Sequence, residues 1–208
     1  KERGIACTSG LPMLIAQAKA ASELFFHRAI SDEVLPSIYQ KIKAETSNIV
    51  LIGMPGCGKT AVGEKTAALS GKSFIDADKI IEEKAGMPIP EIFEKYGEAH
   101  FRQLEAEVLA DIGKTGGQVI ATGGGAVLRR ENYAALKQNG RIYQLTRPVY
   151  KLALSGRPLS KSKEVLAEME KTRAPYYRAF ADAVVSNEGT VLEAANKIWE
   201  DFYENIRD

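Results

Sequence analysis

One stretch of the sequence, from Asn48 to Thr60, constrains the fold more than any other. Its apolar run, Ile49 to Ile52, predicts a buried parallel strand. The run stops at Gly53, and the next residues, up to Thr60, read Gly-Met-Pro-Gly-Cys-Gly-Lys-Thr, which is the spacing of a phosphate-binding P-loop. A helix-forming run, 61–69, follows at once. Strand, glycine-rich loop and helix in this order indicate a nucleotide-binding α/β fold.

Each part of this stretch has a chemical purpose. Glycines let backbone N–H groups turn inward around a phosphate, and the N-terminus of the following helix adds a partial positive charge. Lys59 would reach the β- and γ-phosphates, and the Thr60 hydroxyl would bind Mg²⁺. The alternative is a glycine-rich turn that matches by chance. The predicted ATP-binding residues of the loop are Met54, Pro55, Gly56, Cys57, Gly58, Lys59, Thr60 and Ala61.

Composition excludes several other classes. The chain has 208 residues, 45% hydrophobic and 26% charged, with a net charge of +1, so no global field argues for a nucleic acid or membrane partner. No apolar run approaches the ~20 residues of a membrane span. The two cysteines, Cys7 and Cys57, form no disulfide framework, which fits a reducing, cytoplasmic setting. The first residues carry neither an initiator Met nor a signal-peptide apolar region, so we expect a piece of a longer or processed protein.

From residue 48 to residue 208 strands alternate with helices, which predicts one α/β domain with a parallel, doubly wound sheet. Short apolar runs predict five strands, and periodic segments between them predict helices. The last helix is amphipathic, and its expected inward residues are Val191, Ala194, Ala195, Ile198 and Phe202. Pro175 is expected to interrupt the helix that contains it. The expected strands are 49–52, 73–76, 118–121, 141–145 and 183–185, and the expected helices are 61–69, 79–84, 91–96, 98–112, 131–138, 148–154, 164–173, 176–181 and 190–203.

Residues 1–47 lie outside this unit and predict a helical extension. The segment 11–26 has helical periodicity, 34–43 predicts a second helix, and 41–47 is expected to be the linker. An ordinary extension that packs on a neighbour accounts for this segment. The apolar face expected for the first helix consists of Leu14, Ala18, Ala21 and Phe25.

Further along the chain, polar and glycine-rich segments follow the predicted strands. Asp76 and Asp78 follow the second strand and would lie at the carboxyl edge of the sheet, where ligands bind in such folds. Alternatively, Asp78 simply caps a helix. Gly123–Gly125 allow a close approach of backbone to a ligand, or form a plain turn. Arg102 could make only a surface ion pair with Glu98 or Glu105.

These features, taken in order, resemble shikimate kinase over residues 48–208. The resemblance extends to the segment around Asp76 and Asp78, the glycine triplet at 123–125 and a basic loop around Arg157 that looks like a lid. The matching stretches are Phe74-Ile75-Asp76-Ala77-Asp78, Ile92-Phe93, Gly97-Glu98, Phe101-Arg102, Glu105, Gly123-Gly124-Gly125-Ala126, Arg157-Pro158-Leu159 and Arg173-x-Pro175-x-Tyr177.

That family has a P-loop, nucleoside-monophosphate-kinase-like fold with sheet order 2-3-1-4-5, and it phosphorylates the 3-hydroxyl of shikimate with ATP and Mg²⁺. The resemblance implies that Arg102 and Arg173 hold the substrate carboxylate, since guanidinium groups suit planar, bidentate recognition. It implies that Asp78 accepts hydrogen bonds from the ring hydroxyls and acts as base or orients the nucleophile. Backbone N–H groups of Gly124 and Gly125 would contact the substrate.

For the nucleotide, the resemblance implies that Lys59 and the lid Arg157 stabilise charge on the moving phosphoryl group, which is where catalysis of this reaction resides. Thr60 would bind the metal directly, and Asp76 would hold a metal-bound water. The chain departs from the family in one place: the segment 152–156 lacks the arginine that many members carry before the lid and that is credited with stacking on adenine. Two rivals stay open, a gluconate-kinase-like enzyme of the same fold and a non-catalytic nucleotide-binding module.

A second, shorter resemblance concerns the extension. The segment 10–18, with Gln17, resembles the C-terminal helix of shikimate dehydrogenase, in which a Gln touches shikimate. No Gly-x-Gly-x-x-Gly of a dehydrogenase is present, so we expect no such activity from this chain. The order of the two resemblances predicts that residues 1–47 are the end of a dehydrogenase half fused upstream of the kinase domain.

Overall fold

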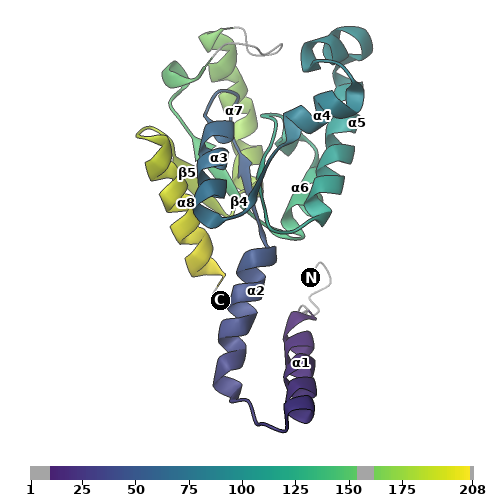
Figure 1. The fold of residues 1–208 in the computed structure, drawn as a ribbon. Helices are drawn as coiled ribbons and strands as arrows, with labels where there is room; N and C mark the ends of the chain where they lie inside the picture. Colours follow the sequence, from purple (N-terminus) through teal and green to yellow (C-terminus); the bar gives the residue numbers. More distant parts are fainter. Residues whose placement is uncertain (1–9, 154–161, 207–208) are drawn as a thin grey trace.

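Five parallel strands form the sheet at the centre of the molecule, in the order β2-β3-β1-β4-β5 (Figure 1). This computed structural model describes residues 10–153 and 162–206. The predicted parallel sheet and its order are confirmed. The strands are β1 (Asn48–Ile52), β2 (Ser73–Asp76), β3 (Gln118–Ala121), β4 (Gly140–Thr146) and β5 (Ala183–Ser186).

The strand that leads into the P-loop lies in the middle of this sheet. In β1, Ile49 pairs with Val119 of β3 on one side and with Arg141 of β4 on the other. Its four apolar residues, 49–52, are completely buried, because helices cover both faces of the sheet. Burying each such side chain stabilises the fold by about 1.5–3 kcal/mol, so the loop that follows starts from a rigid support.

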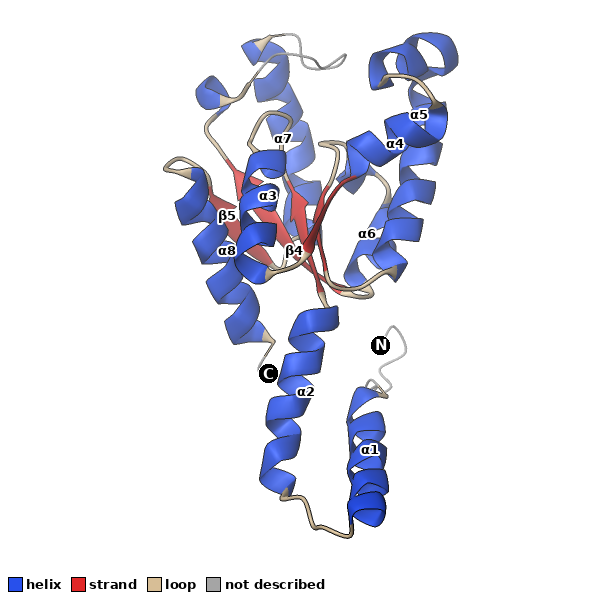
Figure 2. Ribbon diagram, viewed as in Figure 1, coloured by secondary structure: helices blue, strands red, loops and turns tan. Residues whose placement is uncertain are grey.

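The helices form a layer on each face of the sheet (Figure 2). Helices α3 and α8 pack against each other on one face, and α6 and α7 lie on the other. None of the described helices combines the length and apolar character needed to cross a bilayer. The helices are α1 (Leu11–Phe26), α2 (Leu35–Thr46), α3 (Lys59–Ser70), α4 (Ala77–Ala85), α5 (Ile89–Lys114), α6 (Arg130–Lys137), α7 (Lys163–Phe180) and α8 (Val191–Asn205), with short 3₁₀ turns at η1 (Asp32–Val34), η2 (Ala126–Leu128) and η3 (Val149–Lys151).

Several helix ends follow directly from the sequence. Helix α3 ends at Gly71, which adopts the left-handed conformation (φ 71°) that favours glycine. Gly97 (φ 79°) divides α5 into the two helical parts that the sequence predicts. Thr190 and Glu193 form a capping box at the start of α8: each side chain accepts a hydrogen bond from the other residue's backbone N–H.

Three local predictions are wrong. In place of the helix predicted at 148–154, the described residues 148–153 form only the short 3₁₀ turn η3. Pro175 lies inside α7 without ending it, since the helix continues to Phe180. At the start of α8, Val191 was expected to point inward, but it is 38% exposed.

The helical extension forms a hairpin that projects from the end of the sheet opposite the P-loop (Figure 1). Helix α1 matches the predicted range, and Leu14 and Ala18 of its apolar face line a pocket beside α2. That face is not buried: Leu14 and Phe25 are largely exposed, and Ile15 is the residue of α1 that is buried. Which residues of α1 are buried depends on which side of the helix faces α2, and the periodicity of a single helix does not reveal that side. Residues 41–47 are not an irregular linker, because α2 continues to Thr46 and leads almost directly into β1.

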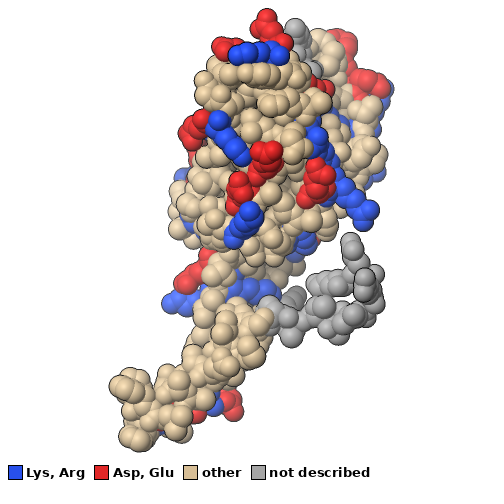
Figure 3. Space-filling view, turned by 90° about the vertical axis from the view of Figure 1, so that its right-hand side faces the viewer, with Lys and Arg blue, Asp and Glu red and all other residues tan. Residues whose placement is uncertain are grey.

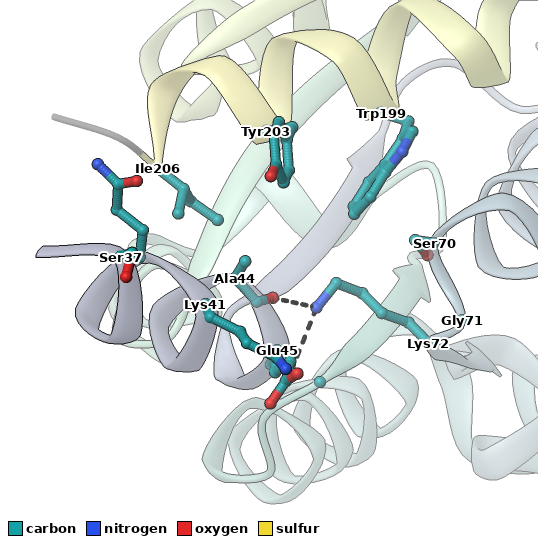
Figure 4. Close-up of a pocket in the computed structure, with 12 residues that line it drawn as sticks. Ser37, Lys41, Ala44, Glu45, Ser70, Gly71, Lys72, Trp199, Tyr203 and Ile206 are labelled. Atoms are coloured by element: carbon teal, nitrogen blue, oxygen red, sulfur yellow. Dashed lines mark hydrogen bonds between the residues drawn. The ribbon is translucent and has the colours of Figure 1, made fainter. Parts of the chain in front are cut away.

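One lysine ties this extension to the rest of the molecule. Lys72 Nζ donates hydrogen bonds to the carbonyl oxygens of Ala44 (2.6 Å), Ser47 (2.8 Å) and Glu45 (3.3 Å), at the C-terminal end of α2. Figure 4 shows the bonds to Ala44 and Glu45. A lysine in this place satisfies helix carbonyls that have no partner within the helix. Beside it, a pocket of about 560 Å³ separates α2 from Trp199 and Tyr203 of α8, at the amino ends of the strands.

Candidate active site

The P-loop connects β1 to α3 with the geometry that its glycines permit. Gly53, Gly56 and Gly58 all have positive φ angles, from 81° to 147°. A Cβ at Gly53 would lie 2.4 Å from the carbonyl oxygen of Leu145, so the loop also packs directly against the end of β4. Asn187, just after β5, donates a hydrogen bond from Nδ2 to the Cys57 carbonyl (2.8 Å) and is buried. The end of the sheet therefore supports the loop from two neighbouring strands.

The charged and hydroxyl groups of the loop point to the same edge. Lys59 Nζ donates to the carbonyls of Gly53 (2.9 Å) and Met54 (3.0 Å), so it lies over the start of the loop. Thr60 Oγ1 donates to Asp76 Oδ2 (2.9 Å). The other oxygen of Asp76 accepts a hydrogen bond from the Asp78 backbone N–H (3.1 Å), so Asp76, not Asp78, caps α4. The side chain of Asp78 is therefore not used as the cap.

The segment after β3 brings the substrate-side candidates together. A Cβ at Gly123 would lie 2.8 Å from both Asp78 Oδ1 and Glu105 Oε1, and a Cβ at Gly125 would lie 2.3 Å from Arg102 Nη2. Any larger residue at these two positions would collide with a charged group. The three glycines thus allow a carboxylate, a guanidinium and the backbone to share one small space.

Arg102 is held by two acids on its own helix. Nη1 donates to Glu105 (2.7 Å), and Nε and Nη2 donate to Glu98 (3.2 and 3.1 Å). Arg102 is 8% exposed and Glu105 is 1% exposed, so the ion pair between Arg102 and Glu105 is buried and not on the surface. Burial raises the pKa of the Glu105 carboxyl, and the Arg102 guanidinium offsets part of that effect. Glu105 therefore holds Arg102 in a fixed position.

Arg173 reaches the same place from α7. Its Nη1 donates to the Gly124 carbonyl (3.0 Å), and the Tyr177 hydroxyl donates to the same oxygen (2.6 Å). Burial raises the pKa of Tyr177, so this hydroxyl keeps its proton as a donor. The two side chains lie one turn apart on α7, which places them both on the helix face that meets the glycine segment.

These groups line one pocket of about 580 Å³ at the carboxyl ends of the strands. The structure brings together most of the residues expected from the sequence. Cys57 is completely buried and does not line the pocket, so its thiol is not open to reagents. Arg157 lies outside the described residues. The expected residues that line the pocket are Pro55, Gly56, Gly58, Lys59, Thr60, Ala61, Asp76, Asp78, Arg102, Gly124, Gly125 and Arg173.

Three further residues of this site were not among the expected ones. Asn187 supports the loop, Glu105 holds Arg102, and Arg147 lines the pocket from the end of β4. Asn187 and Arg147 each directly follow a strand, and this position is the one signal that could have identified them. The sequence offers Glu105 only as a possible ion-pair partner and as part of a matching stretch, without a role in the site, and its burial is a property of the packed fold.

Known proteins with similar sequences point to one family. A family model described as Shikimate kinase matches residues 55–203. The shikimate kinase of Nitrosomonas europaea is 45% identical over 148 residues, covering 67% of this chain and 70% of that protein. That of Thermodesulfovibrio yellowstonii is 42% identical over 164 residues, covering 74% and 94%.

Solved structures agree with the sequence comparisons. The shikimate kinase of Acinetobacter baumannii in complex with shikimate is 37% identical, with a TM-score of 0.74, and covers 80% of this chain and 98% of that one. A gluconokinase from Sinorhizobium meliloti, 18% identical with a TM-score of 0.50, covers 78% and 94% and shares the fold alone. The family model, the relatives and the site agree, and the chain belongs to the shikimate kinase family.

Proposed function

We propose that this chain transfers the γ-phosphoryl group of ATP to the 3-hydroxyl of shikimate, giving shikimate 3-phosphate and ADP, a step in the biosynthesis of aromatic amino acids. One observation carries the proposal. The P-loop, Asp78 and two nearly buried arginines, Arg102 and Arg173, line a single pocket. A phosphate cradle and a two-arginine acid site at one sheet edge suit a kinase whose acceptor is a small carboxylic acid.

Recognition of the acid rests on Arg102 and Arg173. Guanidinium groups bind a carboxylate through pairs of parallel N–H bonds, and they remain charged when buried. Arg102 is positioned by Glu105, and Arg173 by the Gly124 carbonyl. Backbone N–H groups of Gly124 and Gly125 offer further donors beside them. The two arginines come from helices on different sides of the glycine segment, so they suit a carboxylate held between them.

The reacting hydroxyl would then lie near Asp78. In the transfer, a bond forms between the substrate oxygen and the γ-phosphorus while the bond to the β,γ-bridging oxygen breaks. Asp78 accepts a hydrogen bond from the hydroxyl and orients it, or takes its proton as the new bond forms. The Oδ1 atom of Asp78 lies against Gly123, so the carboxylate faces the glycine segment where the substrate would lie.

The residues at the metal position fit Mg²⁺. Thr60 Oγ1 and Asp76 Oδ2 are oxygen donors 2.9 Å apart. Mg²⁺ prefers oxygen, keeps several waters and is usually held by one or two protein groups plus substrate phosphates, so no larger cluster of acids is needed. Thr60 would bind the ion directly and Asp76 through a water. When bound, the ion neutralises charge on the β- and γ-phosphates.

Lys59 supplies positive charge to the transferred group. Its ammonium hydrogen bonds to two loop carbonyls, so it lies over the loop, where phosphate oxygens of ATP would accept hydrogen bonds from it. Arg157 of the lid would add a second charge once the site is loaded. This limits wasteful hydrolysis, because the charged site is complete only when both substrates are present.

An assay of ADP release with shikimate and gluconate in parallel tests the proposal. We expect turnover with shikimate, none with gluconate, and loss of turnover in Lys59→Met. Formation of a single phosphorylated product, identified by mass and ³¹P NMR, shows that ADP does not come from hydrolysis. Turnover with gluconate, or ADP release independent of either acceptor, would contradict the assignment; ATP binding without any turnover would indicate a non-catalytic module.

We also propose that residues 1–47 are a separate unit ahead of a kinase domain at 48–208, and that they are the end of a shikimate dehydrogenase half. The face of the projecting hairpin seen in Figure 3 carries few charged side chains. Leu24, Phe25 and Phe26 of α1 are more than 70% exposed, as expected of a helix that packs on further protein. In an immunoblot of the cytoplasmic fraction of a cell extract, an antibody against this chain should detect a protein much larger than 22.7 kDa. A native species of about this mass would contradict the fusion.

A further inference from the structure

Arg147 follows β4 directly, in a segment that touches the P-loop at two points. Just before it, the Leu145 carbonyl packs against Gly53, the first residue of the loop. Six residues after it, beyond η3, the Ala153 backbone N–H donates to the Gly56 carbonyl (3.4 Å). The sheet order places β4 beside β1, so Arg147 extends from the strand end adjacent to the phosphate cradle.

The guanidinium of Arg147 has no anionic partner within residues 10–153 and 162–206. It lines the 580 Å³ pocket, and its Nε atom is buried without a hydrogen-bond acceptor. Among the described residues Arg147 makes no ion pair, whereas Arg102 is held by two acids and Arg173 by a carbonyl. Arg147 as a whole is half-buried, but a buried N–H donor without an acceptor is destabilising, and the guanidinium cannot lose its proton to avoid this. Such a group in a pocket indicates a site for an anion.

We propose that Arg147 binds the phosphate chain of the nucleotide, as a second fixed cation beside Lys59. This inference rests on the proposed function only for the presence of a nucleotide. A guanidinium is planar and binds phosphate oxygens in pairs, so it adds orientation as well as charge. It also supplies positive charge from the rigid sheet edge, before any loop moves.

The position of β4 favours the phosphate chain over the acid. The glycine segment that belongs to the acid site follows β3, on the other side of β1 from β4. The P-loop follows β1 and so lies between the ends of β3 and β4. An arginine after β4 is therefore closer to the nucleotide than to the acid site. Charge also favours the phosphates over the adenine ring, because a polyphosphate carries several negative charges and the base carries none.

Arg147→Met tests the proposal, because it keeps the apolar stem and removes the charge. Arg178→Met is the matched control: Arg178 is exposed on α7, does not line the pocket, and its loss changes the net charge equally. Calorimetry on the full chain gives Kd for ATP, ADP, adenosine and shikimate. We expect binding of ATP and ADP to weaken about ten- to a hundredfold in Arg147→Met. Adenosine and shikimate should bind as before, and Arg178→Met should match the wild type.

Other outcomes overturn the proposal. Weaker shikimate binding with normal ADP binding would assign Arg147 to the acid; equal losses for ADP and adenosine would assign it to the base or to the fold. Arg147→Lys, which retains the charge, should recover part of the ADP affinity, and it replaces the Met variant if that variant does not fold. If the wild type binds ADP but does not phosphorylate shikimate, the proposed function fails while this test of Arg147 still decides.

Discussion

Arg102 and Glu105 form an ion pair of 2.7 Å inside the protein, three residues apart on α5, while Glu98 binds the same guanidinium from the surface. The side chain of Glu105 is 1% exposed and that of Glu98 is 50% exposed. One arginine thus has two acidic partners in opposite environments. Comparing Glu98 with Glu105 isolates the effect of burial on the strength of an ion pair, since both acids are glutamates on one helix and bind the same arginine.

Replacing the two glutamates should have very different effects on stability. Glu105→Ala leaves the Arg102 charge buried with one partner fewer, and we expect the free energy of unfolding to fall by about 3–5 kcal/mol. Glu98→Ala removes an exposed pair and should cost less than about 1 kcal/mol. Urea unfolding of both variants measures the difference. Equal losses would show that Glu105 does not hold a buried charge.

Replacing Arg102 should weaken the use of shikimate and leave the binding of ATP unchanged. Arg102→Met removes a charged partner of the acid, so kcat/KM for shikimate should fall at least about ten- to a hundredfold, while the Kd for ATP stays near the wild-type value. Steady-state kinetics and calorimetry separate the two effects. Arg129→Met, at a partly exposed arginine that pairs with Glu131 and does not line the pocket, is the control and should change neither. Loss of ATP binding in Arg102→Met would show that the acid site is assigned wrongly.

Replacing Asn187 should instead weaken the binding of ATP. Its Nδ2 holds the Cys57 carbonyl in the P-loop, so Asn187→Ala loosens the loop and leaves a buried carbonyl without its donor. We expect KM for ATP to rise roughly three- to tenfold, with KM for shikimate unchanged. Asn205→Ala, which removes a hydrogen bond on the exposed end of α8, is the comparison. An unchanged KM for ATP in Asn187→Ala would mean that the loop is rigid without this bond.

Lys72 should give stability a pH dependence at alkaline pH. Burial lowers its pKa from 10.5 to about 8, so between these values the unfolded chain binds more protons than the folded one. The contribution of Lys72 to stability therefore rises with pH through this window. The free energy of unfolding of the wild type minus that of Lys72→Met should increase from about pH 8 to pH 10, while the same difference for the exposed Lys65→Met stays flat. A decrease over this range would mean that the hydrogen bonds to α2 outweigh burial.

The sequence predicts the fold well where local patterns decide it. The P-loop, the five strands and the helix divided at Gly97 depend on glycines and short-range periodicity, and each element forms where expected. The wrong predictions depend on neighbours in space. The buried side of α1 is set by α2, so the exposed Phe25 could not be assigned from one helix. Pro175 does not end α7, because packing of its neighbours Arg173 and Tyr177 against the glycine segment stabilises the helix on both sides of it.

The candidate site divides in the same way. Lys59, Asp78 and Arg173 belong to recognisable motifs, and the structure places them around one pocket. Arg147 and Asn187 belong to none, since their positions depend on which strands lie next to β1. Sheet order decides that, and it comes from contacts between segments far apart in the chain. Their chemistry is therefore visible only after the strands are assembled.

A crystal structure of the full chain with shikimate and ADP tests the central claim most directly. We predict that the shikimate carboxylate lies between Arg102 and Arg173, that the 3-hydroxyl points toward Asp78, and that the ADP phosphates fill the loop from Gly53 to Thr60. Shikimate bound at any other surface, or with its carboxylate turned away from both arginines, would contradict the account.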